Sequence, residues 1–144
     1  MPELIWSLHL AATAVMTGVI WFVQFIQYPW FHQVPTDRFP AYHRDYTRRV
    51  GWIVGPTMLV EAASGVVLWW QLQAGLLGWH IAGMALLAIC WLSTAFLQIP
   101  CHLQLGRGYD PAVHARLVHT NWIRTIGWSL RLALLIAMAA RGGV

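Results

Sequence analysis

The chain has 144 residues, of which 58% are hydrophobic and only 10% are charged, and its mean hydropathy is +0.55. Soluble domains carry about 25% charged residues, so this composition excludes a soluble globular protein and indicates an integral membrane protein. Lipid headgroups and topology account for the net charge of +4, so the bilayer is the expected partner and no nucleic-acid partner is expected.

Four apolar segments follow one another along the chain, each close to the ~20 residues that cross a bilayer. We expect helices at about residues 4–30, 49–71, 76–99 and 111–140. The last should begin at Pro111, because Asp110 suits an N-cap and proline is favoured at the first helical position. The expected fold is all-α, an integral membrane four-helix bundle that forms a single domain over residues 1–144.

The arginines are unevenly distributed among the connections between these segments. Seven of the nine lie in or beside the first and third connections, and the second connection has none. The seven are Arg38, Arg44, Arg48, Arg49, Arg107, Arg116 and Arg124. Because basic residues accumulate on the cytoplasmic side, we expect both charged connections there. Both chain ends would then lie outside, in a multi-pass protein of the bacterial inner membrane.

Two ionisable residues, Glu61 and Arg131, fall near the middle of the second and fourth spans. A charge at the bilayer centre costs on the order of 3 kcal/mol or more, so each needs a partner or a function. At 1.5 Å per residue, both lie about 15–18 Å from the end of the bundle that holds the charged connections. Because their depths in the membrane are equal, the two side chains should meet. They are the candidate catalytic residues, Glu61 as a proton shuttle and Arg131 as a group that binds a carbonyl or carboxylate. The alternative is a structural ion pair that fixes helix register.

A second polar group lies nearer the charged connections and forms the candidate ligand-binding set: Gln24, Tyr28, Gln98, Asn121 and Arg124. The three-four spacing of Asn121, Arg124 and Arg131 places them on one face, turned toward the bundle interior. Many donors then face a single carboxylate, which favours a negative or carbonyl-bearing ligand. We expect a polar cavity that opens toward the cytoplasm and ends at Glu61 and Arg131. In the alternative, Arg124 reaches a lipid phosphate.

His9 and His80 lie near the outer ends of the first and third spans. Two histidines at one level on different helices are typical of a bis-imidazole heme b, which makes heme one candidate cofactor. Interfacial histidines bonded to water or headgroups are the alternative. No metal site is expected, because His114 and His119 are five residues apart and point about 140° away from each other.

Several stretches resemble known membrane proteins: WFVQFIQYPWF at 21–31, GPTMLVEAASG at 55–65, QIPCHLQL at 98–105 and HTNWIRTIGWSLR at 119–131. They resemble an uncharacterised family of small bacterial four-helix membrane proteins, most specifically at NWIRT. The Asn-x-x-Arg-Thr start is similar to that of anthrone-oxygenase-like membrane proteins, some of which act on polycyclic aromatic substrates. His9 and the Trp79-His80 pair resemble the four-helix, heme-carrying protoporphyrinogen oxidase, from which the fourth span departs.

These features favour a membrane-embedded redox or oxygenase-like protein that binds an apolar aromatic, quinone-like or porphyrin ligand. The alternative is a non-enzymatic structural or accessory subunit, in which the polar network only fixes helix packing. The sequence leaves open whether the protein is an enzyme. A transporter is disfavoured because four helices give too little wall for alternating access, unless the protein forms a homo-oligomer.

Overall fold

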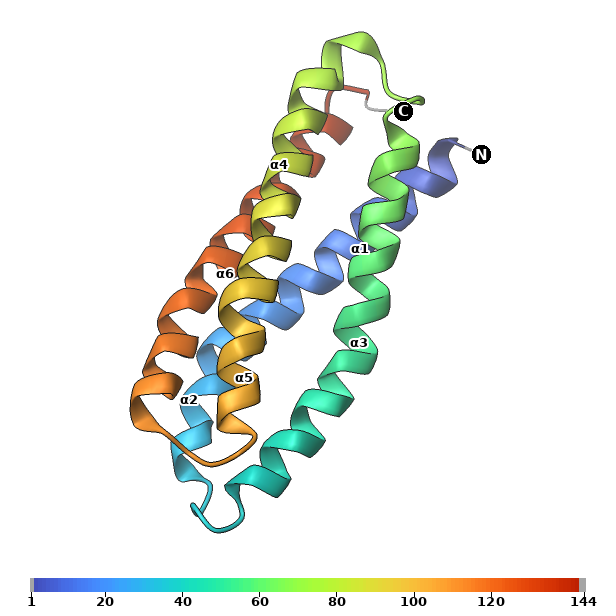
Figure 1. Cartoon of the computed structure of the whole chain (residues 1–144). Coiled ribbons are helices and arrows are strands. Elements are labelled where there is room, and N and C mark those ends of the chain that lie inside the picture. Colours follow the sequence, from blue (N-terminus) through green and yellow to red (C-terminus); the bar gives the residue numbers. More distant parts are fainter. Residues whose placement is uncertain (1, 143–144) are drawn as a thin grey trace.

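The computed structural model describes residues 2–142, and almost all of them are helical (Figure 1). The α-helices are α1 (Pro2–Phe22), α2 (Tyr28–Trp30), α3 (Phe39–Leu68), α4 (Leu77–Ser93), α5 (Ile99–Leu105) and α6 (Pro111–Ala139). Two π-helical segments, η1 (Val23–Gln27) and η4 (Thr94–Gln98), and two 3₁₀ turns, η2 (Phe31–Gln33) and η3 (Ala74–Leu76), complete the set. No strand occurs within residues 2–142.

These elements join into four continuous rods, which we number in chain order: Glu3–Gln33, Phe39–Leu68, Ala74–Leu105 and Pro111–Ala139. Each rod is long and apolar enough to cross a membrane. Large apolar side chains such as Trp52, Phe96 and Leu103 project outward and are 66–77% exposed, a surface suited to lipid. The chain is therefore an all-α, four-helix, multi-pass membrane protein, as the sequence predicted.

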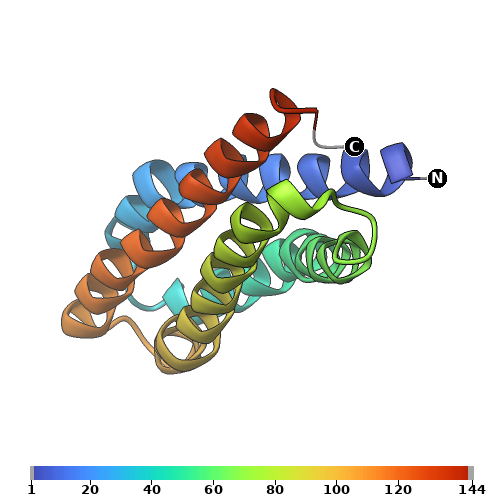
Figure 2. The same ribbon diagram turned by 90° about the horizontal axis from the view of Figure 1, so that it is seen from above.

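The rods pack unevenly. The first rod packs along α3 and α6, and α4 packs along α6. The ribbons of α3 and α4 stand apart in both views (Figures 1 and 2), and these two helices meet through the side chains of His80 and Met84 at Gly65. The second rod meets the third mainly at α5. We call the end of the bundle that holds the connections at residues 34–38 and 106–110 the Arg-rich end. The described chain ends and the turn at residues 69–73 lie together at the opposite end (Figure 1).

Two helix boundaries differ from the sequence prediction. The second rod begins at Phe39 rather than near residue 49, and the third continues to Leu105 rather than ending near 99. The extra turns are polar, so hydropathy does not detect them. Asp45 nevertheless accepts hydrogen bonds from Arg48 and Arg49, both at 2.6 Å, and such i,i+3 and i,i+4 pairs stabilise a charged helical turn. The last rod begins with Asp110 accepting from the backbone N–H of Ala112 and Val113.

A π-helical segment precedes a proline in both the first and the third rod. Pro29 follows η1 and Pro100 follows η4. A proline inside a helix lacks an N–H and clashes with the carbonyl four residues earlier, and a widened turn relieves both problems. The two widened turns carry Gln24 and Gln98 and position Tyr28.

Two glycines make room for side chains of a neighbouring rod. A Cβ on Gly127 would lie 2.5 Å from Cys90 Sγ, and one on Gly65 would lie 2.7 Å from Met84 Sδ. Small residues at such crossings are the usual basis of helix packing in membranes. Cys90 and Cys101 are both buried and free.

Candidate functional site

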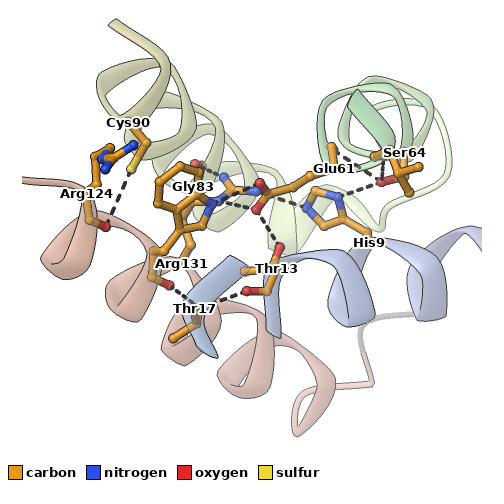
Figure 3. Close-up of polar contacts among 11 residues, drawn as sticks. His9, Thr13, Thr17, Glu61, Ser64, Gly83, Cys90, Arg124 and Arg131 are labelled. Atoms are coloured by element: carbon orange, nitrogen blue, oxygen red, sulfur yellow. Dashed lines mark hydrogen bonds and ion pairs between the residues drawn. The ribbon is translucent and has the colours of Figure 1, made fainter. Parts of the chain in front are cut away.

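Glu61 and Arg131 meet at the centre of the bundle, as their depth along the sequence suggested. The Arg131 Nε lies 3.0 Å from Glu61 Oε1, and the two side chains are 1% and 0% exposed. Thr13 donates to the same carboxylate oxygen at 2.7 Å (Figure 3). Trp128 Nε1 donates to Glu61 Oε2 at 3.0 Å. Both carboxylate oxygens are thus occupied by donors of the protein itself.

The remaining donors of Arg131 are also used within the bundle. Its Nη1 donates to the carbonyl of Gly83, and its Nη2 lies 3.4 Å from His9 Nε2 (Figure 3). An arginine can only donate, so His9 accepts at Nε2 and carries its proton on Nδ1, which donates to Ser64 Oγ at 2.9 Å. The network joins all four rods and is closed, with charges that neutralise each other.

The histidine pair does not fit a heme. The His9 and His80 rings have centroids 6.4 Å apart, but His9 Nε2 faces Arg131 and His80 Nε2 donates to the Gly65 carbonyl at 2.9 Å. The space between them is about 10 Å³, which holds roughly one water molecule. A cofactor pocket measures about 300 Å³ or more. No porphyrin is therefore assigned to these residues.

A separate and much larger cavity, of about 800 Å³, lies between α3 and the third rod. Its deep half, toward the middle of the bundle, is apolar and is lined by Met16, Ile20, Val54, Met58 and Trp91. Its other half, near the Arg-rich end, carries polar groups: Tyr28, His43, Arg44, Thr47, Thr94, Gln98, His102, Arg107 and Arg124. Exposed Leu59 and Leu103 border the cavity, so it opens sideways between the two rods.

Arg124 is the charged centre of this cavity. Its Nε donates to Asn121 Oδ1 at 2.9 Å, its Nη2 donates to Tyr28 Oη at 3.0 Å and to Asn121, and its Nη1 lies 3.4 Å from Thr94 Oγ1. The residue is only 7% exposed, and no carboxylate forms an ion pair with it within residues 2–142. Arg124 is thus a buried cation held by neutral groups, and it lines the cavity.

A hydrogen-bonded chain leads from Arg124 toward the Arg-rich end. Tyr28 Oη lies 3.0 Å from His102 Nε2, and His102 Nδ1 lies 3.0 Å from His43 Nε2. His43 is fully buried, and its Nδ1 has no hydrogen-bond partner. Neutral imidazole donates from one nitrogen and accepts at the other, so this chain can run in either direction. Tyr28 can therefore donate its proton either to His102 or to a molecule in the cavity.

The predicted site residues separate into three groups. Tyr28, Gln98 and Arg124 line the cavity. Gln24 and Asn121 do not line it but support Arg124 from behind, with Asn121 Nδ2 donating to Gln24 Oε1 at 2.7 Å. Glu61 and Arg131 line no part of the large cavity.

The expectation that one cavity ends at Glu61 and Arg131 is therefore wrong. Met16, Ile20, Met58, Cys90 and Trp128 form an apolar cluster at this level. The Trp128 ring belongs to this cluster while its indole N–H binds the Glu61 carboxylate. The bundle thus holds two polar centres with different surroundings, one closed and one open.

Sequence reasoning missed His43 and His102 as members of the open site. His43 lies before residue 49, where the second helix was expected to begin, and His102 lies beyond residue 99, where the third was expected to end. The signal that could have found His43 is Asp45 followed by Arg48 and Arg49, because this i,i+3 and i,i+4 spacing favours a helix that begins before residue 49. Within the described residues, no three His, Cys, Asp or Glu side chains are arranged to hold a metal ion.

Comparison with known proteins gives no relative for this chain: no family model, curated protein or solved structure matches it. The assignment of function therefore depends on the residues of the cavity.

Proposed function

We propose that this protein binds an apolar, carbonyl-bearing or anionic aromatic molecule, of the quinone-like class, in the cavity between α3 and the third rod. The polar end of the ligand contacts Arg124 and Tyr28, and its apolar body extends toward Met16 and Met58. Redox or oxygenase-like chemistry on that molecule is the proposed activity, in a bacterial inner membrane with both chain ends outside.

The observation that carries this proposal is the uncompensated charge of Arg124. A buried guanidinium surrounded by neutral acceptors is stabilised by a carboxylate, an enolate or a carbonyl oxygen placed beside it. The Glu61 carboxylate cannot serve, because its oxygens already bind Arg131, Trp128 and Thr13. A ligand oxygen is the remaining candidate to balance Arg124.

The shape and polarity of the cavity support the same class of ligand. A volume of about 800 Å³ lies within the range typical of small-molecule sites, and such sites combine apolar walls with a few polar groups that fix orientation. The lateral opening suits a molecule that dissolves in lipid and enters from the membrane. The resemblance of the NWIRT stretch to anthrone-oxygenase-like proteins also supports an aromatic substrate.

Tyr28 is the group best placed for proton exchange with such a ligand. It accepts from Arg124 and can donate its own proton either to His102 or to a ligand in the cavity, so a ligand oxygen there can receive or return a proton. We assign this role to Tyr28 with His102, in place of the Glu61 shuttle. The closed surroundings of Glu61 and Arg131 favour the structural alternative for that pair alone.

The test is equilibrium binding of 2-methyl-1,4-naphthoquinone to the protein in lipid nanodiscs, compared between Arg124→Gln and Arg116→Gln. Arg116 lies on the same helix but is exposed and does not line the cavity. We expect Arg124→Gln to weaken binding by about tenfold or more, since hydrogen bonds to charged groups contribute ~1.5–3 kcal/mol. Arg116→Gln should change it less than about twofold. Equal affinity in all three proteins would reject a ligand site at Arg124.

A further inference from the structure

Some glycines of the membrane spans are packed against neighbouring rods, and others face open space. Gly65 and Gly127 lie so close to neighbouring side chains that a Cβ on either residue would clash with them. Gly51 and Gly55, in contrast, line the large cavity from α3, and a Cβ on either would meet no atom within 4 Å. Their positions differ by four residues, so they are about one helical turn, or roughly 6 Å, apart on one face.

Helix packing does not explain Gly51 and Gly55. A glycine inside a helix weakens it relative to alanine, and in membrane helices the usual compensation is close contact with another helix. No such contact exists here, because no atom of another rod lies within 4 Å of a Cβ built on either residue. The neighbouring proline offers a different structural explanation for Gly55, because the missing Cβ relieves the clash with the ring of Pro56. Gly51 does not precede a proline, so this explanation does not apply to it.

We infer that Gly51 and Gly55 are specificity-determining positions, which keep the α3 wall flat so that a planar fused ring can lie against the helix backbone. This inference rests on the proposed function and narrows its ligand to rigid, flat ring systems. The third rod lines the other side of the cavity with Thr94 and Ala95, which are also small. We call the space between these small residues of the third rod and Gly51 and Gly55 of α3 the slot, and the two glycines extend it over roughly 6 Å along α3.

The polar groups around the slot fit an oxygen on the edge of such a ring. Arg124 and Tyr28 line the same cavity and are joined by a hydrogen bond of 3.0 Å from Arg124 Nη2 to Tyr28 Oη. An acyl chain is flexible and bends around side chains, so it requires neither two glycines one turn apart nor a buried cation. A flat aromatic ketone or quinone uses both features.

The experiment compares two probes of equal ring count in lipid nanodiscs: planar 2-methyl-1,4-naphthoquinone and the saturated, non-planar ketone 1-decalone. The variants are Gly51→Leu, Gly51→Ala and the controls Gly18→Leu and Gly18→Ala. Gly18 is the matched control because it is exposed on α1, has no atom within 4 Å and lies outside the cavity. Binding is measured by equilibrium dialysis, and stability by the melting temperature.

We expect Gly51→Leu to lower the preference for the planar probe at least about tenfold, as overfilling a packed site does. Gly18→Leu should leave that preference within about twofold. Both alanine variants should melt about 2–4 °C higher, because alanine is the better helix former and neither position is crowded. If the wild type binds the naphthoquinone and Gly51→Leu keeps the same preference, or if the Gly51 variants lose stability, the slot is refuted. If the wild type binds neither probe, the proposed function itself fails.

Discussion

Removal of either partner of the Glu61–Arg131 pair should destabilise the bundle strongly, whereas removal of both should cost less than the sum. The two side chains are 0% and 1% exposed, so neither lipid headgroups nor water can screen the charge that remains. Breaking a buried ion pair commonly costs about 3–5 kcal/mol, because an uncompensated charge is left behind. The coupling between two contacting residues is about 0.5–3 kcal/mol.

The two single substitutions should not be equivalent. In Glu61→Gln, Arg131 keeps its charge, because a guanidinium cannot lose its proton in a protein. In Arg131→Met, Glu61 keeps its donors Thr13 and Trp128, and the carboxyl can also become neutral by binding a proton. We therefore expect Glu61→Gln near the upper end of the 3–5 kcal/mol range and Arg131→Met near its lower end, with a coupling of about 2 kcal/mol.

The assay is reversible unfolding in mixed micelles with increasing dodecyl sulfate, followed by circular dichroism, for the wild type, both singles and the double variant. The control is the same cycle for Asp45 and Arg49, whose side chains are 2.6 Å apart but 43% and 74% exposed. That pair should couple by no more than about 0.5 kcal/mol. The buried pair would be refuted as the centre of the bundle by either of two results. One is that the losses of unfolding free energy in the Glu61 and Arg131 variants simply add in the double variant. The other is that the Glu61–Arg131 cycle and the Asp45–Arg49 cycle give equal coupling energies.

Three further predictions concern packing, topology and the ligand site. Gly127→Ala should lower the melting temperature, because its Cβ would lie 2.5 Å from Cys90 Sγ, whereas Gly18→Ala should not lower it. Equal melting temperatures for the two variants would contradict the close approach of α4 and α6. A phosphatase reporter fused at the C-terminus should be active outside the cytoplasm, since arginines gather at the other end of the bundle, and cytoplasmic activity would reverse the topology. Tyr28→Phe should weaken naphthoquinone binding about threefold to tenfold through loss of one hydrogen bond, with no change expected if the ligand lies elsewhere.

Hydropathy and spacing predicted the class of fold and the residues of the central pair. The cost of a charge in hydrocarbon forces Glu61 and Arg131 toward each other, and the helix rise sets their common depth, so both follow from the sequence alone. The face shared by Asn121, Arg124 and Arg131 follows in the same way, and all three are buried.

The division into a closed and an open centre could not be predicted. It depends on how far α3 stands from the third rod, and that distance is set by side-chain packing across the bundle rather than by any one helix. The place of His43 in the open site was not predicted for a different reason. The helical turns around His43 are charged, and only the Asp45 pairs indicate that they are helical. The widened turns before Pro29 and Pro100 likewise depend on how each rod absorbs its proline.

The most direct test of the central claim is native mass spectrometry of the protein extracted from its own membrane in mild detergent, for the wild type, Arg124→Gln and Gly51→Leu. A ligand site beside Arg124 predicts a bound aromatic ketone, quinone or aromatic acid in the wild type and its loss from both variants. Phospholipid alone, bound equally to all three proteins, would contradict the proposed function and leave the cavity as a lipid-filled gap in the bundle.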